Sequence, residues 1–159
     1  MDDYDLQQVC LNGHQITNSA HFNPKEQMKS CPSCGEKTIK TCPHCDHRIR
    51  GCYLMRGVRY PGETPVPSFC EECGRPFPWQ VSALANLAEV IKESDLSDDE
   101  REEFNSAVKD VVRDTQMTDS SALKLRRLLS KMGKPIYDIS IKVLSDIASE
   151  TAKKTMGLD

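Results

Sequence analysis

The stretch CPSCGEKTIKTCPHC, residues 31–45, carries four cysteines in two C-x2-C pairs that are separated by seven residues. Either the four thiols hold one metal ion together, or each pair binds a metal with ligands from elsewhere in the chain. Eight cysteines occur among the 159 residues, and all of them lie at or before Cys73. The chain therefore divides by composition into a cysteine-rich N-terminal half and a charged C-terminal half without cysteine.

The N-terminal sequence MDDYDLQQVC has neither the basic segment nor the apolar segment of a secretory signal. No apolar run in the chain approaches the roughly 20 residues needed to span a bilayer. We therefore expect a soluble, cytoplasmic protein without a membrane partner. In that reducing compartment, paired cysteines are expected to be metal ligands rather than disulfides.

Four two-ligand units follow one another in the N-terminal half, each with two or three residues between its ligands. Such a turn is typical of a zinc knuckle, in which a residue of positive φ lets backbone amides face the sulfurs. Gly35 and Gly74 stand at that position, Asp46 replaces glycine in the third unit, and Gly13 lies in the first. The eight candidate ligands are Cys10, His14, Cys31, Cys34, Cys42, Cys45, Cys70 and Cys73. Thiolate-rich tetrahedral sites suit zinc, so we predict two structural zinc ions.

Three pairings of these units are compatible with the sequence. Sequential pairing joins the first unit to the second and the third to the fourth, with loops of 16 and 24 residues. Nested pairing makes residues 31–45 a single site with a loop of only seven residues. Crossed pairing is the RING-like arrangement, in which the second and third units usually lie nearly side by side. Loop length favours two zinc ribbons in tandem, and the other two pairings remain alternatives.

Two segments resemble known zinc ribbons. CLNGH followed downstream by CPSCG is similar to the common ribbon whose first knuckle is C-x-N-G-H. CPHCDHRIRG followed by PSFCEECGRPFPW resembles the second ribbon of an uncharacterised bacterial zinc-ribbon family, and the resemblance extends over the whole chain to SETAKK near its end. It implies the same eight ligands and the sequential pairing, and it implies no activity.

The segment from His47 to Tyr60 is rich in arginine and tyrosine and contains no acidic residue. Alternation along a ribbon strand would place Arg48 and Arg50 on one face and Ile49 on the other. Arginine for the backbone and tyrosine for base stacking would suit a single-stranded nucleic acid. An exposed hairpin face that balances the acidic helices is the simpler interpretation. The candidate contacts with nucleic acid or a partner are Arg48, Arg50, Arg56, Arg59, Tyr53 and Tyr60.

Two further features of the N-terminal half are expected to serve packing. Cys52 is the one thiol outside the four units, and a lone cysteine in an apolar strand is more often a packing residue than a nucleophile. Phe77 and Trp79 follow the last unit in the sequence PFPW. We expect these two rings to pack the ribbon onto the first helix.

From Val81 onward, apolar residues recur at the spacing of amphipathic helices. We predict a zinc-ribbon region over residues 1–79 and a helical domain of three to four amphipathic helices over residues 80–159. The fold class is thus a small metal-bound β structure followed by an all-α domain.

Local signals predict where these helices begin and end. Ser97 and Glu100 have the spacing of a capping box, and Thr118 or Asp119 is expected to cap the following helix. The last helix is predicted to begin near Pro135 and to continue to about residue 154. A basic run of Lys124, Arg126, Arg127 and Lys131 is expected to be an ordinary exposed helix face.

These observations favour a non-catalytic zinc-binding adaptor or regulatory protein whose partner is another protein. A metal with four protein ligands has no open position for substrate or water, and no Gly-rich phosphate loop is present. The net charge of −3 argues against non-specific electrostatic binding to the phosphate backbone of nucleic acid. Binding of nucleic acid through the arginine hairpin is one alternative. A RING-like ubiquitin-transfer module, which requires crossed pairing, is another.

Overall fold

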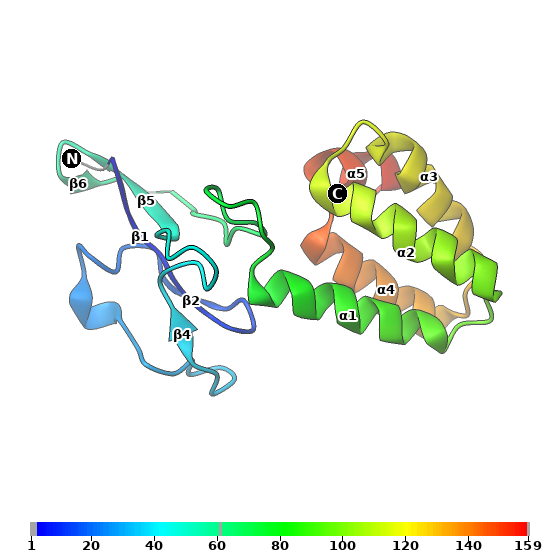
Figure 1. Cartoon of the computed structure of the whole chain (residues 1–159), viewed down its shortest axis with the longest axis horizontal. Coiled ribbons are helices and arrows are strands. Elements are labelled where there is room, and N and C mark those ends of the chain that lie inside the picture. The colour runs from blue at the N-terminus through cyan, green and yellow to red at the C-terminus, as the bar shows by residue number, and fades with distance from the viewer. Residues whose placement is uncertain (1–2, 61, 159) are drawn as a thin grey trace. The chain divides into compact units, whose positions relative to one another are not determined.

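The computed structural model describes residues 3–60 and 62–158. It divides the chain into two compact units, residues 1–82 and residues 83–159, which are described separately below (Figure 1). The first unit contains two small antiparallel sheets and the second contains helices. The predicted fold class, small β structure with cysteine clusters followed by an all-α part, is confirmed.

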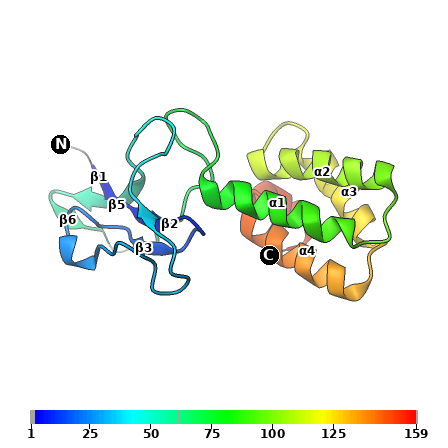
Figure 2. The ribbon, with the colours of Figure 1, turned by 60° about the horizontal axis from the view of Figure 1, so that its bottom comes forward.

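The first unit is built on two three-stranded sheets. One has the strand order β1-β5-β6, with β1 Tyr4–Leu6, β5 Arg50–Met55 and β6 Val58–Arg59. The other has the order β3-β2-β4, with β3 Gln15–Thr17, β2 Gln8–Cys10 and β4 Thr38–Ile39. Figure 2 shows β2 beside β3, and Figure 1 shows β1 beside β5.

The N-terminal segment belongs to both sheets, which the sequence did not indicate. β1 pairs with β5, so that Tyr4 lies opposite Tyr53. β2 follows directly and pairs with β3 and β4 of the other sheet. Between them, the backbone N–H of Gln7 donates to the carbonyl of Ile49 over 2.8 Å. The two ribbons are therefore joined by hydrogen bonds and are not independent modules in tandem.

The seven residues between the two central cysteine pairs contain β4, in which Ile39 lies opposite Val9 and Thr38 opposite Cys10. The segment thus contributes an edge strand to the β3-β2-β4 sheet.

The arginine-rich segment forms the β5–β6 hairpin as expected. Met55 lies opposite Val58, and the two residues between them have positive φ, 51° at Arg56 and 78° at Gly57. A two-residue turn of this kind matches the right-handed twist of the strands. Ahead of the hairpin, Ile49 is buried between two exposed arginines, so the predicted alternation is confirmed.

Over residues 78–158, the structure has five helices rather than three or four. They are α1 Pro78–Lys92, α2 Asp98–Arg113, α3 Thr118–Leu129, α4 Lys134–Ile147 and α5 Glu150–Met156 (Figure 1). α1 begins within the first unit and continues into the second. The prediction that the last helix continues to residue 154 is wrong, because Ala148 is extended and Ser149 caps a new helix by accepting from the N–H of Ala152.

Two predicted caps have different outcomes. The capping box of Ser97 and Glu100 is present with both of its hydrogen bonds. The next helix begins at Thr118 after Met117, which makes no side-chain cap, so capping by Thr118 or Asp119 is wrong.

The helical unit has a conventional apolar core. α3 packs against α2 and α5. The side chains of Phe104, Val111, Leu125, Leu128 and Leu144 are fully buried. Within the described residues, no helix is both long enough and apolar enough to cross a membrane.

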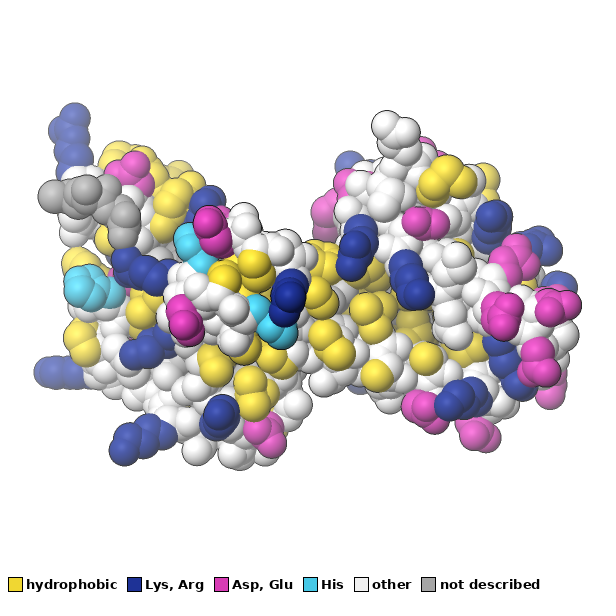
Figure 3. All heavy atoms as spheres, in the orientation of Figure 1, with side chains coloured by type: hydrophobic (Ala, Val, Ile, Leu, Met, Phe, Trp, Pro, Cys, Tyr) yellow, Lys and Arg dark blue, Asp and Glu magenta, His cyan; other side chains and the backbone are white. Residues whose placement is uncertain are grey.

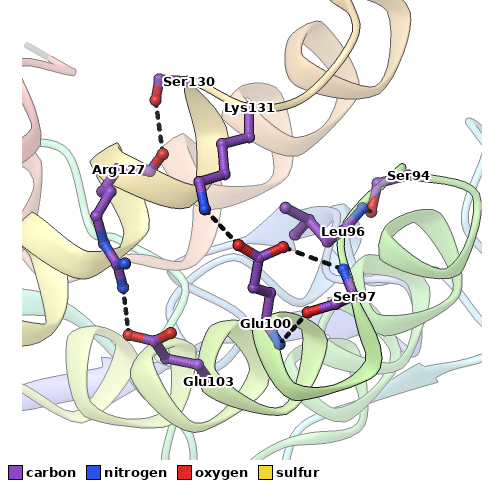
Figure 4. A network of polar contacts seen from close by, with 8 residues as sticks. All are labelled: Ser94, Leu96, Ser97, Glu100, Glu103, Arg127, Ser130 and Lys131. Carbon is purple, nitrogen blue, oxygen red and sulfur yellow. Dashed lines mark hydrogen bonds and ion pairs between the residues drawn. The ribbon is translucent and has the colours of Figure 1, made fainter.

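Charged side chains connect α2 to α3 on the surface (Figure 4). Glu100 accepts from Lys131, and Glu103 pairs with Arg127. Two members of the basic run are therefore engaged with acidic residues of the neighbouring helix. On the face seen in Figure 3, basic and acidic side chains are interspersed over the helices, as expected of an ordinary exposed surface.

Candidate metal centres

The structure brings the eight predicted ligand residues together in two groups of four. The first group is Cys10, His14, Cys31 and Cys34, and the second is Cys42, Cys45, Cys70 and Cys73. In each group, the candidate ligand atoms all lie within 4.8 Å of one another. The grouping follows the sequential pairing. The nested and crossed pairings are wrong, and the RING-like alternative, which required crossed pairing, falls with them.

Distances between ligand atoms in the first group match a tetrahedral site. The Sγ of Cys10 lies 3.7 Å from the Sγ of Cys34. The Nδ1 of His14 lies 3.5 Å from the Sγ of Cys10 and 3.6 Å from the Sγ of Cys31. Tetrahedral zinc with Zn–S of about 2.3 Å and Zn–N of about 2.05 Å requires S–S separations of about 3.8 Å and S–N separations of about 3.5 Å.

The second group shows the same dimensions with sulfur alone. The Sγ atoms of Cys42 and Cys73 are 3.8 Å apart, and those of Cys45 and Cys70 are 3.6 Å apart. Both contacts join one knuckle to the other. The chemistry and spacing of both donor sets fit a metal ion with four protein ligands.

Three of the four knuckles have the same backbone geometry. In the knuckle of Cys31, the N–H of Gly35 donates to the carbonyl of Cys31 over 2.8 Å, and the cysteine N–H donates to Glu36. The knuckles of Cys42 and Cys70 repeat this pattern. The residue after the second ligand has positive φ in each, 77° at Gly35, 60° at Asp46 and 71° at Gly74. The sequence-based interpretation of these turns is confirmed.

Each group places one ligand of each knuckle inside and one outside. The buried members are Cys10, Cys31, Cys42 and Cys70, and the exposed members are His14, Cys34, Cys45 and Cys73. The buried thiols therefore contribute to the core of the unit. Cys42 and Cys70 lie in one apolar cluster with Ile49 and Phe77.

Backbone amides and neighbouring thiols shift the pKa values of the cysteine ligands. The backbone amide of Glu36 is the main group that lowers the pKa of Cys34, to about 6. At Cys45 the amide of His47 acts in the same direction, but burial and hydrogen bonds with neighbouring thiols outweigh it and raise the pKa to about 12. Four crowded sulfurs cannot all ionise without a compensating positive charge. A divalent cation would supply that charge.

Trp79 connects the two knuckle regions, a role that the sequence did not indicate. Its ring stacks on Phe77 with centroids 4.7 Å apart and packs against the cluster of the second group. Its Nε1 donates to the carbonyl of Pro67 over 2.8 Å. A Cβ atom at Gly13, in the first knuckle, would lie only 3.0 Å from the Cβ of Trp79.

The candidate contact residues of the hairpin are largely engaged within the protein. Arg50 pairs with Glu71 over 2.6 Å, and Arg59 donates to the Oδ1 of Asn18 over 3.0 Å. Arg48 is exposed and also has an interaction partner. Arg56 lies in the turn, while Tyr53 and Tyr60 line a cavity that is described below. Nucleic-acid binding by this segment stays a prediction.

Cys52 does not join either metal group. It is buried in β5, with 3% of its surface exposed. Burial raises the pKa of its thiol, and the carboxylate of Asp5 adds to the effect. A thiol with a raised pKa is a poor nucleophile, in agreement with the predicted packing role.

The class of protein is thus one in which two Cys/His groups that could hold metal ions lie on knuckle turns, beside small sheets, and are followed by helices. The chain belongs to an uncharacterised family of proteins conserved in bacteria, DUF2321, which matches residues 3–156. The resemblance seen in the sequence is thereby confirmed. Comparison with curated proteins and with solved structures gives no match.

Proposed function

We propose that the protein binds two zinc ions, one in each cysteine group, and that both ions are structural. The observation that carries this proposal is that each group gathers four ligand atoms within 4.8 Å of one another, with separations such as 3.5 Å and 3.8 Å that match the edge of a zinc tetrahedron. Three thiolates with one imidazole, and four thiolates, are both common ligand sets of structural zinc.

The ligand count argues against catalysis at these metals. A catalytic zinc keeps a position for water or substrate, and it typically has three protein ligands. Here each group supplies four. The metals would then hold the fold together without activating a water molecule.

A protein with structural metals and a separate helical unit fits the role of an adaptor or regulator. Our proposal is that it acts in the cytoplasm by binding another protein. The helical unit presents single exposed apolar side chains, such as Leu123 and Ile139, and the ribbon unit presents a tyrosine-lined cavity. Either unit therefore offers surface for a protein partner.

Metal analysis of the purified protein tests the zinc proposal. We expect two zinc ions per chain by elemental analysis and native mass spectrometry. Cys10→Ser and Cys42→Ser should each lower the content to about one. Cys52→Ser is the matched control, because it removes a buried thiol that belongs to neither group, and it should retain two. A wild-type protein with one zinc or none would overturn the proposal.

Affinity purification from the native host at low and high salt tests the adaptor role. A protein partner that is retained at high salt supports it. A nucleic acid that is bound at low salt and lost at high salt would instead support the arginine-hairpin alternative, since phosphate contacts weaken steeply with salt.

A further inference from the structure

A cavity lies beside the β1-β5-β6 sheet, and Glu71 of the last knuckle is the one lining residue that it shares with a metal-binding turn. Its volume is about 390 Å³, within the range of ligand pockets. Three tyrosines line it together with residues 62–65 and 67, which are called the second wall below. The main lining residues are Tyr4, Tyr53, Tyr60, Arg50, Glu63 and Glu71.

Hydrogen bonds from within the same unit hold the second wall in place. Two of them reach backbone carbonyls over short distances: Gln15 Nε2 donates to Thr64 over 2.7 Å, and Trp79 Nε1 donates to Pro67 over 2.8 Å. Asn18 Nδ2 also donates to the hydroxyl of Thr64. Thr64 and Pro67 of the second wall are therefore tied to the rest of the unit.

One cation already occupies part of this aromatic surface. The guanidinium carbon of Arg50 lies 4.5 Å from the centroid of the Tyr4 ring. The same guanidinium pairs with a carboxylate oxygen of Glu71 over 2.6 Å. Tyr53 meets Tyr4 edge to face, with centroids 5.3 Å apart. Arg50 of the protein itself is thus bound between the aromatic ring of Tyr4 and the carboxylate of Glu71.

The charge of the lining favours a second cation over an anion. Arg50 is compensated by Glu71, so it has little charge left to attract a phosphate. Glu63 makes no hydrogen bond or ion pair with any residue that the structure describes. The three charged lining residues sum to one net negative charge, and the whole chain carries −3.

We propose that this cavity binds a positively charged side chain, lysine or arginine, of a partner protein. The rings of Tyr53 and Tyr60 are 41% and 52% exposed, so they offer π faces to a cation. The carboxylate of Glu63 balances its charge at the rim. The inference rests on the proposed adaptor function and names the chemistry of the partner at this surface.

Titration of the zinc-loaded full-length protein with a capped glycyl-arginyl-glycine peptide, followed by amide NMR, tests the proposal. We expect saturable shifts at Tyr53, Tyr60 and Glu63, and much weaker shifts with the matched citrulline peptide, which is neutral. Glu63→Gln and Tyr60→Leu should each raise the dissociation constant about twofold to fivefold. Tyr137→Leu, at a similarly exposed tyrosine of the helical unit, should leave it unchanged.

Arg50→Gln gives the sharpest result, because it frees the face of Tyr4 and one carboxylate oxygen of Glu71, whose other oxygen lies 3.1 Å from the Nε2 of His47. If the cavity selects cations, this variant binds the arginine peptide more tightly than the wild type. Weaker binding by Arg50→Gln, an equal response to the citrulline peptide, or shifts of the same amides by an oligothymidylate would overturn the inference.

The zinc content of each sample separates the two proposals. A chain with two zinc ions and no response to the arginine peptide refutes the cation site and leaves the structural zinc proposal standing. If Tyr60→Leu loses zinc, Glu63→Gln decides the matter, because Glu63 is an exposed residue.

Discussion

The two units of this protein obtain their cores by different means. In the ribbon unit, the apolar cluster of Cys42, Ile49, Cys70 and Phe77 contains two candidate metal ligands among its four buried members. In the helical unit, the fully buried side chains are ordinary apolar residues such as Phe104 and Leu125. The sequence of this unit contains neither cysteine nor histidine.

Strand length explains why the ribbon unit would need its metals. Its six strands have two to six residues each, and short isolated hairpins are at best marginally stable in water. The helices of the other unit have seven to sixteen residues and bury apolar faces against one another. One unit should therefore depend on metal and the other should not.

Removal of the metals should unfold the ribbon unit and leave the helical unit folded. In zinc-finger peptides, structural zinc binds with an apparent free energy of about 10–16 kcal/mol. Because the metal site does not exist in the unfolded peptide, this binding free energy stabilises the folded state. Trp79 is the only tryptophan and lies in the ribbon unit, so its fluorescence reports on that unit, while far-UV circular dichroism reports mainly on the helices. With a strong chelator, we expect the Trp79 signal to change and most of the helical signal to remain. Simultaneous loss of both signals would contradict the prediction that only the ribbon unit depends on metal.

Truncation of the helical core should have the reverse effect. Phe104 is fully buried in α2, and Phe104→Ala should cost about 3–5 kcal/mol of unfolding free energy. Denaturant unfolding followed by circular dichroism measures this cost. Tyr137→Ala, at a residue 41% exposed, is the matched control and should cost less than about 1 kcal/mol. Both variants should keep two zinc ions, and loss of zinc in Phe104→Ala would show that the units are not independent.

Short-range features of this chain were predictable from the sequence. The knuckle turns, the capping box at Ser97 and the burial of Ile49 depend on residues within a few positions of one another. Steric and hydrogen-bonding rules fix such features locally. The sequential pairing of knuckles was favoured by loop length and by the resemblance to known zinc ribbons, and the structure agrees with it.

Features that depend on distant residues were not predictable. The pairing of Tyr4 with Tyr53 joins segments about fifty residues apart, and nothing in either segment specifies the other. The break between α4 and α5 carries neither glycine nor proline; the N–H of Ser149 there donates to the carbonyl of Val111 over 2.8 Å. In both cases a tertiary contact contributes to the structure, and at Ser149 it accompanies the local helix cap.

A methyl group at Gly13 should disturb the contact between the first knuckle and Trp79. Gly13 has a φ of 89°, and a Cβ there would lie 3.0 Å from Trp79 Cβ and 3.2 Å from its Cγ. Gly13→Ala adds this overlap to the backbone strain, for a total cost of about 2–3 kcal/mol. Gly35→Ala is the matched control, because its φ of 77° imposes similar strain with nothing within 4 Å of the new Cβ, so we expect about 1 kcal/mol. Zinc retention in a chelator competition measures both, and equal effects would show that the Trp79 contact contributes nothing.

The smallest expected effect concerns Glu100 in the helical unit. Lys131 is the main cause that holds the pKa of its carboxyl below the ordinary value of 4.5, and the N–H of Ser97 contributes as well. Since the folded state favours the ionised form, this stabilisation is present above the unfolded pKa and is lost as the pH falls through the lower folded pKa. Glu100→Gln should therefore lower the melting temperature at neutral pH, and the difference from wild type should shrink toward zero in acid. Glu102→Gln, at an exposed position of the same helix, should show a difference that does not change with pH. A pH-independent difference at Glu100 would mean that its contribution comes from packing and neutral hydrogen bonds. The ion pair between Glu100 of α2 and Lys131 would then add nothing to the stability of the helical unit.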